Sequence, residues 1–133
     1  MTKPHGIVTG AGKGIGLSIV KNLLSNGYAV TAITRSANKD LDFLIKAYKG
    51  SFNVIYFDLE KIDKVSAFFN KVLKSNSFSF LVNNAGIRAR YPLIKIKDKE
   101  LINVINTNFL SSLKIKKKYI KKIKKNKIHK HSI

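Results

Sequence analysis

The chain has 133 residues, of which 44% are apolar, and its 26 lysines and arginines against 7 acidic residues give a formal net charge of +19. This length and apolar content predict one folded domain and exclude a disordered chain. The absence of cysteine excludes disulfides and thiolate metal sites, and no apolar run approaches the roughly 20 residues of a membrane span. Because no signal-like segment precedes the first apolar run, we expect a cytoplasmic protein; no metal site is predicted.

The first apolar run leads directly into a glycine-rich turn. Ile7 to Thr9 predicts a buried strand, and the turn from Thr9 to Gly16 (T-G-A-G-K-G-I-G) opens an amphipathic helix over about 14–26. Such a turn directs backbone N–H groups and the positive end of a helix dipole at one place, which suits a phosphate. An ordinary loop between strand and helix is the alternative interpretation.

Strands and helices then alternate along the chain. Apolar periodicity and glycine stops predict strands over 28–34, 52–57 and 78–82, and helices over about 39–49 and 62–74. Crossovers of this length require a parallel sheet with helices on both faces. We predict an α/β, Rossmann-like, doubly wound sheet of order 3-2-1-4 that is truncated before strand five.

The organisation along the chain is expected to be that of a single, incomplete dinucleotide-binding domain. Residues 1–96 would hold the four strands and the turns, 97–125 one long helix, and 126–133 a basic tail. No acidic residue follows Glu100, whereas ten lysines lie between Lys114 and Lys130. A basic helix with an apolar stripe could bind nucleic acid or an anionic membrane. Because lysine is common throughout the chain, we interpret it as a solvated face and expect no specific nucleic-acid or membrane partner.

A second turn, Asn83-Asn84-Ala85-Gly86, follows the fourth strand at its carboxyl end. Ligands of open α/β sheets bind beyond the carboxyl ends of the strands, near the switch between strands one and four. We therefore expect this turn to lie beside the glycine turn. Asparagine amides that satisfy nearby backbone groups are a compatible interpretation.

With these two turns, the chain resembles the short-chain dehydrogenase/reductase family, and most of all its members related to 3-oxoacyl-acyl-carrier-protein reductase. Two more segments carry the resemblance: Asp58-Leu59 matches the acidic pair that borders the adenine, and 104–108 matches the helix segment whose catalytic asparagine falls on Asn108. The resemblance covers essentially the whole chain but only the amino-terminal half of the family. It implies an oxidoreductase that transfers a hydride between a nicotinamide cofactor and a small carbonyl or alcohol substrate.

The resemblance also implies the cofactor-binding residues, which are Thr9, Gly10, Gly12, Lys13, Gly14, Ile15, Gly16, Arg35, Asp58, Leu59, Asn84, Ala85 and Gly86. In this assignment Asp58 accepts a hydrogen bond from the adenine amino group, and Asn84 lines the nicotinamide-ribose side. An N-cap for the third helix is an equally weighted alternative for Asp58.

Charge at the end of the second strand favours NADP(H) over NAD(H). A turn that selects NAD usually has a carboxylate there, bonded to the ribose 2′-hydroxyl. In this chain the strand ends Thr34-Arg35-Ser36, and no acid occurs before Asp40. Arg35 and Lys13 would instead neutralise a 2′-phosphate; the alternative is two solvated cations.

The family's proton-donating Tyr-x-x-x-Lys pair and its serine are missing after Asn108. The only tyrosine in that part of the chain is Tyr119, and Ile123 stands where the lysine is needed. We interpret Tyr119 as a packing residue of the long helix, which corresponds to a subunit-interface helix in the family and makes a homo-oligomer possible. The chain is thus expected to be the cofactor-binding half of the enzyme; the alternative is a non-catalytic nucleotide-binding or interaction module completed by a partner.

Overall fold

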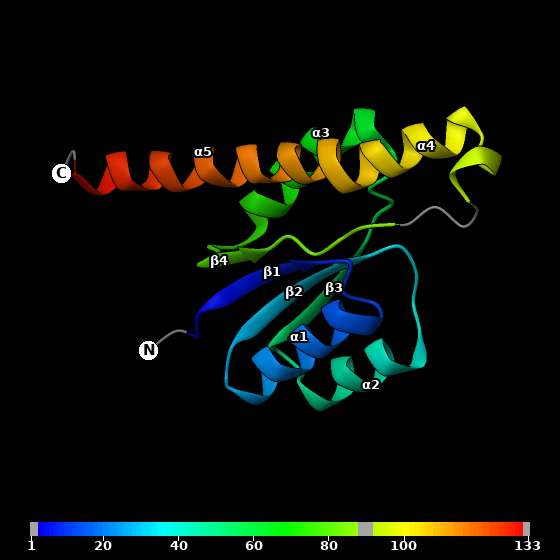
Figure 1. The fold of residues 1–133 in the computed structure, drawn as a ribbon. Helices are drawn as coiled ribbons and strands as arrows, with labels where there is room; N and C mark the ends of the chain where they lie inside the picture. The colour runs from blue at the N-terminus through cyan, green and yellow to red at the C-terminus, as the bar shows by residue number, and fades with distance from the viewer. Residues whose placement is uncertain (1–2, 88–91, 132–133) are drawn as a thin grey trace. The chain divides into compact units, whose positions relative to one another are not determined.

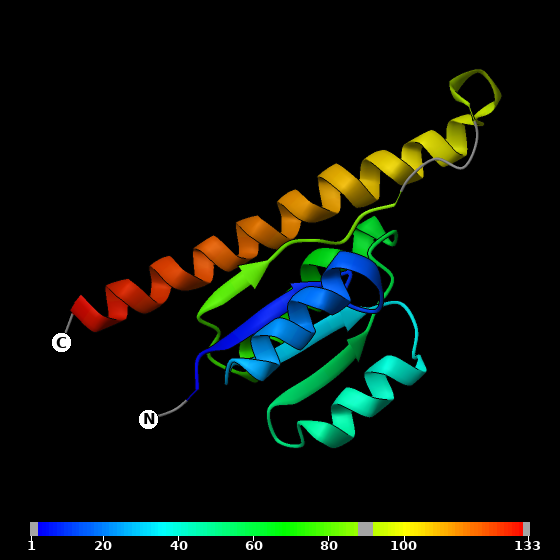
Figure 2. The ribbon, with the colours of Figure 1, turned by 60° about the horizontal axis from the view of Figure 1, so that its bottom comes forward.

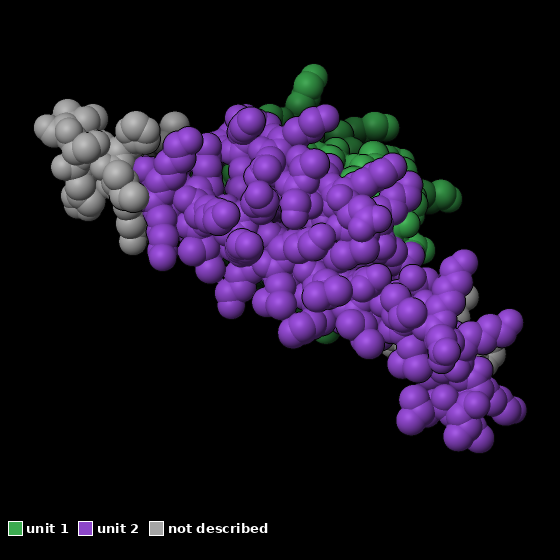
Figure 3. Space-filling model, turned by 90° about the horizontal axis from the view of Figure 1, so that it is seen from above, with its two compact units in different colours: residues 1–59, 78–86 green, residues 60–77, 87–133 purple. Residues whose placement is uncertain are grey.

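The computed structural model describes residues 3–87 and 92–131. The chain divides into two compact units (Figure 3). Unit 1 consists of Met1–Leu59 and Phe78–Gly86, and unit 2 consists of Glu60–Ser77 and Ile87–Ile133. Each unit has its own secondary structure and is described separately.

Unit 1 contains a four-stranded parallel sheet. Its strands are β1 (His5–Thr9), β2 (Ala29–Thr34), β3 (Phe52–Tyr56) and β4 (Phe80–Val82). They lie in the order β3-β2-β1-β4, with Ile7 of β1 paired to both Thr31 and Leu81. The predicted Rossmann-like class and strand order are confirmed. Because β1 and β4 are adjacent and parallel, the loops after them leave the sheet at the same edge.

Two helices, α1 (Gly14–Ser25) and α2 (Lys39–Ala47), lie on one side of this sheet (Figures 1 and 2). Alternate residues of the strands face them, as the period of two in a strand requires. The resulting core contains Val8, Val30, Ala32 and Phe52 from the strands and Leu17, Val20, Leu24, Leu41 and Leu44 from the helices. The turn that follows α1 uses Gly27 at φ +86°, a conformation that glycine adopts at little cost.

Unit 2 is helical. It contains α3 (Ile62–Ser75), a short 3₁₀ turn η1 (Leu93–Lys95), α4 (Asp98–Ile105), a π-helical turn η2 (Asn106–Ser111) and α5 (Ser112–His131). The elements α4, η2 and α5 form one continuous helical run, which Figure 2 shows in yellow to red. Helix α5 packs closely along α3, and Lys114 Nζ of α5 donates to the Ile62 carbonyl of α3 at 3.1 Å.

The predicted division at residue 125 is wrong. The helical run begins at Asp98 and continues to His131, so most of the expected basic tail is helical, and residues 132–133 lie outside the described residues. No glycine or proline occurs between these positions, and lysine is a good helix former, so nothing ends the helix at 125. The π-helical turn within the run has no signal in the apolar pattern.

None of the helices in the described part of the chain has the length and apolar character needed to cross a bilayer.

The fourth strand is shorter than predicted. It begins at Phe80, and Phe78 before it lies edge-to-face against the ring of His5, with the ring centroids 4.8 Å apart. The Ser79 N–H donates to the His5 carbonyl at 2.8 Å, which leads the chain into the sheet beside β1. Gly6 of β1 is required here, since a Cβ atom would collide with the Phe80 ring.

Candidate functional site

Thr9, the last residue of β1, joins the two turns at the carboxyl edge of the sheet. Its side chain is fully buried, and its hydroxyl accepts hydrogen bonds from the backbone N–H groups of Asn84 and Ala85, each at 3.0 Å. The same hydroxyl donates to Asn83 Oδ1 at 3.5 Å. The expected proximity of the glycine turn and the Asn-Asn-Ala-Gly turn is therefore confirmed.

Gly10 lies where the two turns touch. Its φ is +62°, and a Cβ atom there would lie 2.8 Å from the Ala85 Cα. The Asn84 side-chain amide donates to the Gly10 carbonyl at 3.3 Å, so this amide does satisfy a nearby backbone group. A Cβ atom on Gly16 would collide with the same carbonyl. Gly10 and Gly16 are thus needed for close packing within the turn, in addition to any role toward a ligand.

The other side of the turn is held by β2 and by the start of α2. The Ala11 N–H donates to the Ile33 carbonyl at 3.3 Å, and a Cβ atom on Gly12 would lie 2.5 Å from Thr34 Oγ1. The side-chain amide of Asn38 donates to the Gly12 carbonyl at 2.6 Å. This role of Asn38 was not predicted from the sequence. Its position three residues before Leu41, at the start of a helix, marks it as an N-cap but gives no sign of the contact with Gly12.

The middle of the turn faces open space. The side chain of Lys13 is exposed, and Ile15 is 73% exposed. Gly14 has a φ of +56°, and a Cβ atom there would meet nothing within 4 Å. The first N–H groups of α1 belong to these residues and have no acceptor within the helix. The arrangement is a rigid turn with open amide donors at a helix N-terminus, which is suited to binding an anion.

The residues expected around an adenosine follow β2 and β3. Arg35 is exposed directly after Thr34, whose carbonyl accepts from the Phe57 N–H at 2.9 Å. Asp58 then follows, half-buried, with Leu59 buried behind it. The N-cap position of α3 is Lys61, so the alternative in which Asp58 is that N-cap is wrong.

Asn108 lies on the π-helical turn of unit 2, and both polar atoms of its side chain bind the backbone of one residue. Asn108 Oδ1 accepts from the Ile87 N–H at 2.7 Å, and Asn108 Nδ2 donates to the Ile87 carbonyl at 2.6 Å. Ile87 is the residue after Gly86 in the sequence. Asn108 therefore fixes the backbone that leaves the Asn-Asn-Ala-Gly turn, and π-helical turns of this kind often mark functional sites.

Comparison with known proteins decides the family. A family model described as short chain dehydrogenase matches residues 5–129. The chain belongs to this family. It is 27% identical over 133 residues to the benzil reductase ((S)-benzoin forming) of Bacillus cereus, covering 96% of this chain and 53% of the relative. It is 34% identical over 113 residues to a 3-oxoacyl-[acyl-carrier-protein] reductase of Staphylococcus aureus, covering 81% and 45%. The solved structure "ElxO with NADP Bound" superposes with a TM-score of 0.78 at 29% identity, covering 93% and 52%.

The predicted resemblance, including the likeness to 3-oxoacyl-acyl-carrier-protein reductases, is confirmed. Both of these curated relatives are named as reductases. This short-chain dehydrogenase chain spans about half the length of the curated relatives it matches.

Two tyrosines of the chain bear on the expected Tyr-x-x-x-Lys spacing. Tyr119 is half-buried in α5, and burial raises the pKa of its phenol, which agrees with a packing role. The spacing Tyr-x-x-x-Lys does occur at Tyr91 and Lys95, a match missed by looking only after Asn108. Lys95 ends the 3₁₀ turn η1, and Tyr91 lies outside the described residues.

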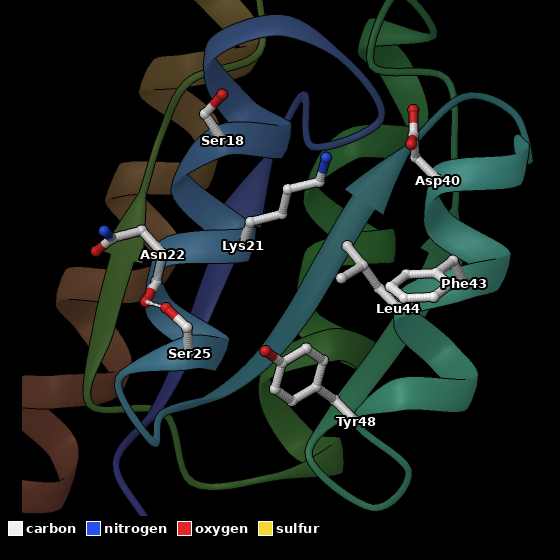
Figure 4. A pocket seen from close by; sticks show the side chains of 8 residues that line it. All are labelled: Ser18, Lys21, Asn22, Ser25, Asp40, Phe43, Leu44 and Tyr48. Carbon is white, nitrogen blue, oxygen red and sulfur yellow. Dashed lines mark hydrogen bonds between the residues drawn. The ribbon is translucent and has the colours of Figure 1, made fainter.

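A groove of about 750 Å³ lies between α1 and α2, away from the glycine turn (Figure 4). Its lining residues are Ser18, Lys21, Asn22, Ser25, Asp40, Phe43, Leu44 and Tyr48. This lining contains no residue of either turn. This groove therefore differs from the open face of the glycine turn, which is the surface with the donor groups for an anion.

Proposed function

We propose that this chain is the cofactor-binding part of an NADP(H)-dependent short-chain oxidoreductase, which interconverts a carbonyl and an alcohol by hydride transfer. The observation that carries the proposal is the glycine turn, which is held by Thr9 and Asn84 on one side and by Asn38 on the other. Its exposed middle presents the amide donors of the α1 N-terminus in a fixed direction. Such preorganised donors bind a diphosphate without a further ordering cost.

The preference for the 2′-phosphorylated cofactor rests on charge. Arg35 and Lys13 are exposed cations, and Asp40 is the first acid after β2. An arginine fork binds two phosphate oxygens at once, which a ribose hydroxyl cannot match. The relative ElxO, at 29% identity, has been solved with NADP bound. When bound, the cofactor would supply the hydride, and this chain's residues would hold and orient it.

The remaining residues take roles around the same cofactor. Asp58, with Leu59 behind it, would border the adenine, and Asn84, Ala85 and Gly86 would line the nicotinamide-ribose side. We assign Asn108 to positioning, because both of its polar atoms bind Ile87. This role differs from its expected catalytic assignment: the side chain would hold the backbone that follows Gly86 in the sequence rather than contact the substrate.

Calorimetric titration of the chain with NADPH and with NADH tests the proposal. We expect saturable binding of both cofactors, with the smaller dissociation constant for NADPH. A second assay follows NADPH oxidation with a panel of aldehydes and ketones. We expect no turnover from this chain alone, since Ile123 replaces the needed lysine after Tyr119 and the spacing at Tyr91 and Lys95 precedes Asn108 rather than following it. Absence of binding to either cofactor would contradict the proposal, and equal affinities would contradict the preference for NADP(H).

A second candidate is a nucleotide-binding module completed by another chain. The helical run in unit 2 favours it, because large apolar side chains are exposed there at Ile102 (56%), Ile105 (51%), Phe109 (59%) and Leu113 (47%). An exposed apolar stripe on a helix is typical of an interface. In this candidate the stripe would bind a second copy of the chain. Sedimentation velocity should then show a dimer for the wild-type chain and a monomer for Phe109→Lys.

A further inference from the structure

Asn38 makes two contacts with one side chain. Its Oδ1 accepts from the Leu41 N–H at 2.9 Å and caps α2, while its Nδ2 donates to the Gly12 carbonyl at 2.6 Å. The first contact is local and serves the helix. The second reaches 26 positions back along the chain to the glycine turn. Helix capping does not require this second contact.

The contact with Gly12 fixes a peptide group of the turn. The Gly12 carbonyl and the Lys13 N–H belong to the same planar trans peptide, so they point in opposite directions. With the carbonyl held by Asn38, the Lys13 N–H is directed away from α2. Lys13 is the N-cap residue of α1, in an extended conformation at φ −158° and ψ 172°, so its N–H is not used by the helix.

The residues that flank Lys13 restrict this peptide little by themselves. At Gly12 a side chain is excluded because Thr34 Oγ1 occupies the space. At Gly14, on the other side of Lys13, a Cβ atom would meet only open space. A glycine on each side of Lys13 leaves the local backbone with more conformations than other residues would allow. The hydrogen bond from Asn38 to the Gly12 carbonyl therefore favours one orientation of the peptide.

We propose that Asn38 is a positioning residue for the dinucleotide, which orients the Gly12–Lys13 peptide so that its N–H meets the anionic adenosine side of the cofactor. This inference rests on the proposed function, because it names a determinant of the same site. It assigns the two atoms of one side chain to separate tasks: the oxygen stabilises α2, and the amide sets the donor for the ligand.

Two variants separate these tasks. Asn38→Ser keeps a capping oxygen, because serine is as good an N-cap as asparagine, but it loses the amide donor to Gly12. Asn38→Ala loses both. We expect the dissociation constant for NADPH to rise about three- to tenfold in both variants, as the loss of one hydrogen bond predicts. The thermal midpoint should fall further in Asn38→Ala, which loses both hydrogen bonds, than in Asn38→Ser, which loses only the one to Gly12.

Asn26→Ser is the matched control. Asn26 Nδ2 also donates to a backbone carbonyl, that of Asn22 at 2.8 Å, but it lies at the opposite end of α1. We expect this variant to bind NADPH as the wild type does. If Asn38→Ser also binds as the wild type does while Asn38→Ala binds weakly, the side chain is only a cap and the inference is wrong. If the wild-type chain itself binds no dinucleotide, the proposed function fails, and the inference fails with it.

Discussion

The backbone N–H of Asn84 donates to the hydroxyl of Thr9 at 3.0 Å, across 75 positions of the sequence. One buried hydroxyl thereby joins the ends of β1 and β4, which are the strands on either side of the expected cofactor crevice. The contact orders both turns before any ligand arrives. A preorganised site of this kind loses less conformational entropy on binding.

Replacing Thr9 by valine tests this link. The change keeps the volume and the β-branch but leaves the N–H groups of Asn84 and Ala85 without their acceptor, at a fully buried position. We expect a loss of about 1–3 kcal/mol in the free energy of unfolding, together with weaker NADPH binding, measured by urea denaturation and calorimetry. Thr9→Ser retains the hydroxyl and should lose much less of both. Equal effects of the two variants would show that the methyl group, rather than the hydroxyl, is what matters.

Two glycines that both have a positive φ separate backbone strain from ligand contact. Gly14 in the turn and Gly27 after α1 have φ of +56° and +86°, and a Cβ atom on either would meet nothing within 4 Å. Alanine at either position should therefore cost a similar amount of stability, about 1 kcal/mol from the positive φ alone. Only Gly14→Ala places a methyl group at the open face of the turn. We expect it alone to weaken NADPH binding in calorimetry, and a matching loss in Gly27→Ala would contradict that assignment.

Much of the fold could be predicted from the sequence because local patterns and global topology agree. The alternation of apolar strands with amphipathic helices, together with one glycine turn after the first strand, determined the order β3-β2-β1-β4. The meeting of the two turns followed from that order, since Thr9 ends β1 and Asn84 lies just after β4, the adjacent parallel strand. The helix boundary at 125 could not be predicted, because lysine continues a helix as readily as it forms a solvated tail.

Parts of the candidate site could not be predicted from the sequence for a different reason. The contact from Asn38 to Gly12 and the paired hydrogen bonds from Asn108 to Ile87 depend on side-chain direction. Composition and periodicity carry no such information. The π-helical turn around Asn108 likewise changes which residues share a face, and a regular period of 3.6 cannot represent it.

Arg35 is the residue on which the preference for NADP(H) depends most. Replacing it by aspartate removes the cation and puts a carboxylate at the end of β2, where a 2′-hydroxyl could be bound instead. We expect the dissociation constant for NADPH to rise by about ten- to a hundredfold, as loss of a charge-assisted pair implies, and that for NADH to change little. Lys49→Asp makes the same charge change at an exposed position after α2 and should affect neither cofactor. An equal loss for NADPH and NADH in Arg35→Asp would remove the argument.

The paired hydrogen bonds of Asn108 make a prediction for the backbone after the second turn. In Asn108→Ala the N–H of Ile87 loses its acceptor, so its amide hydrogen should exchange with solvent at least about tenfold faster, since each lost hydrogen bond contributes about 1 kcal/mol or more. Thr107→Val is the neighbouring control. Among the described residues, the buried Thr107 hydroxyl has no hydrogen-bond partner, so its removal should leave the Ile87 exchange rate unchanged. Unchanged exchange in Asn108→Ala would show that Asn108 does not position this segment.

The imidazole of His5 makes the stability of unit 1 depend on pH. His5 Nε2 lies 2.8 Å from Thr31 Oγ1, its ring packs against Phe78, and burial lowers the pKa of His5 from its usual 6.5. The folded chain therefore favours the neutral ring, while the unfolded chain takes up a proton at a higher pH. The stabilising contribution is fully present above about pH 6.5, the ordinary histidine value, and is lost as the pH falls through the lower pKa of the folded state. His5→Phe keeps a ring against Phe78 but cannot titrate. Urea denaturation between about pH 5 and 8 should show the wild type losing more stability than His5→Phe as the pH falls, across the range in which histidine titrates, and parallel curves would contradict the assignment.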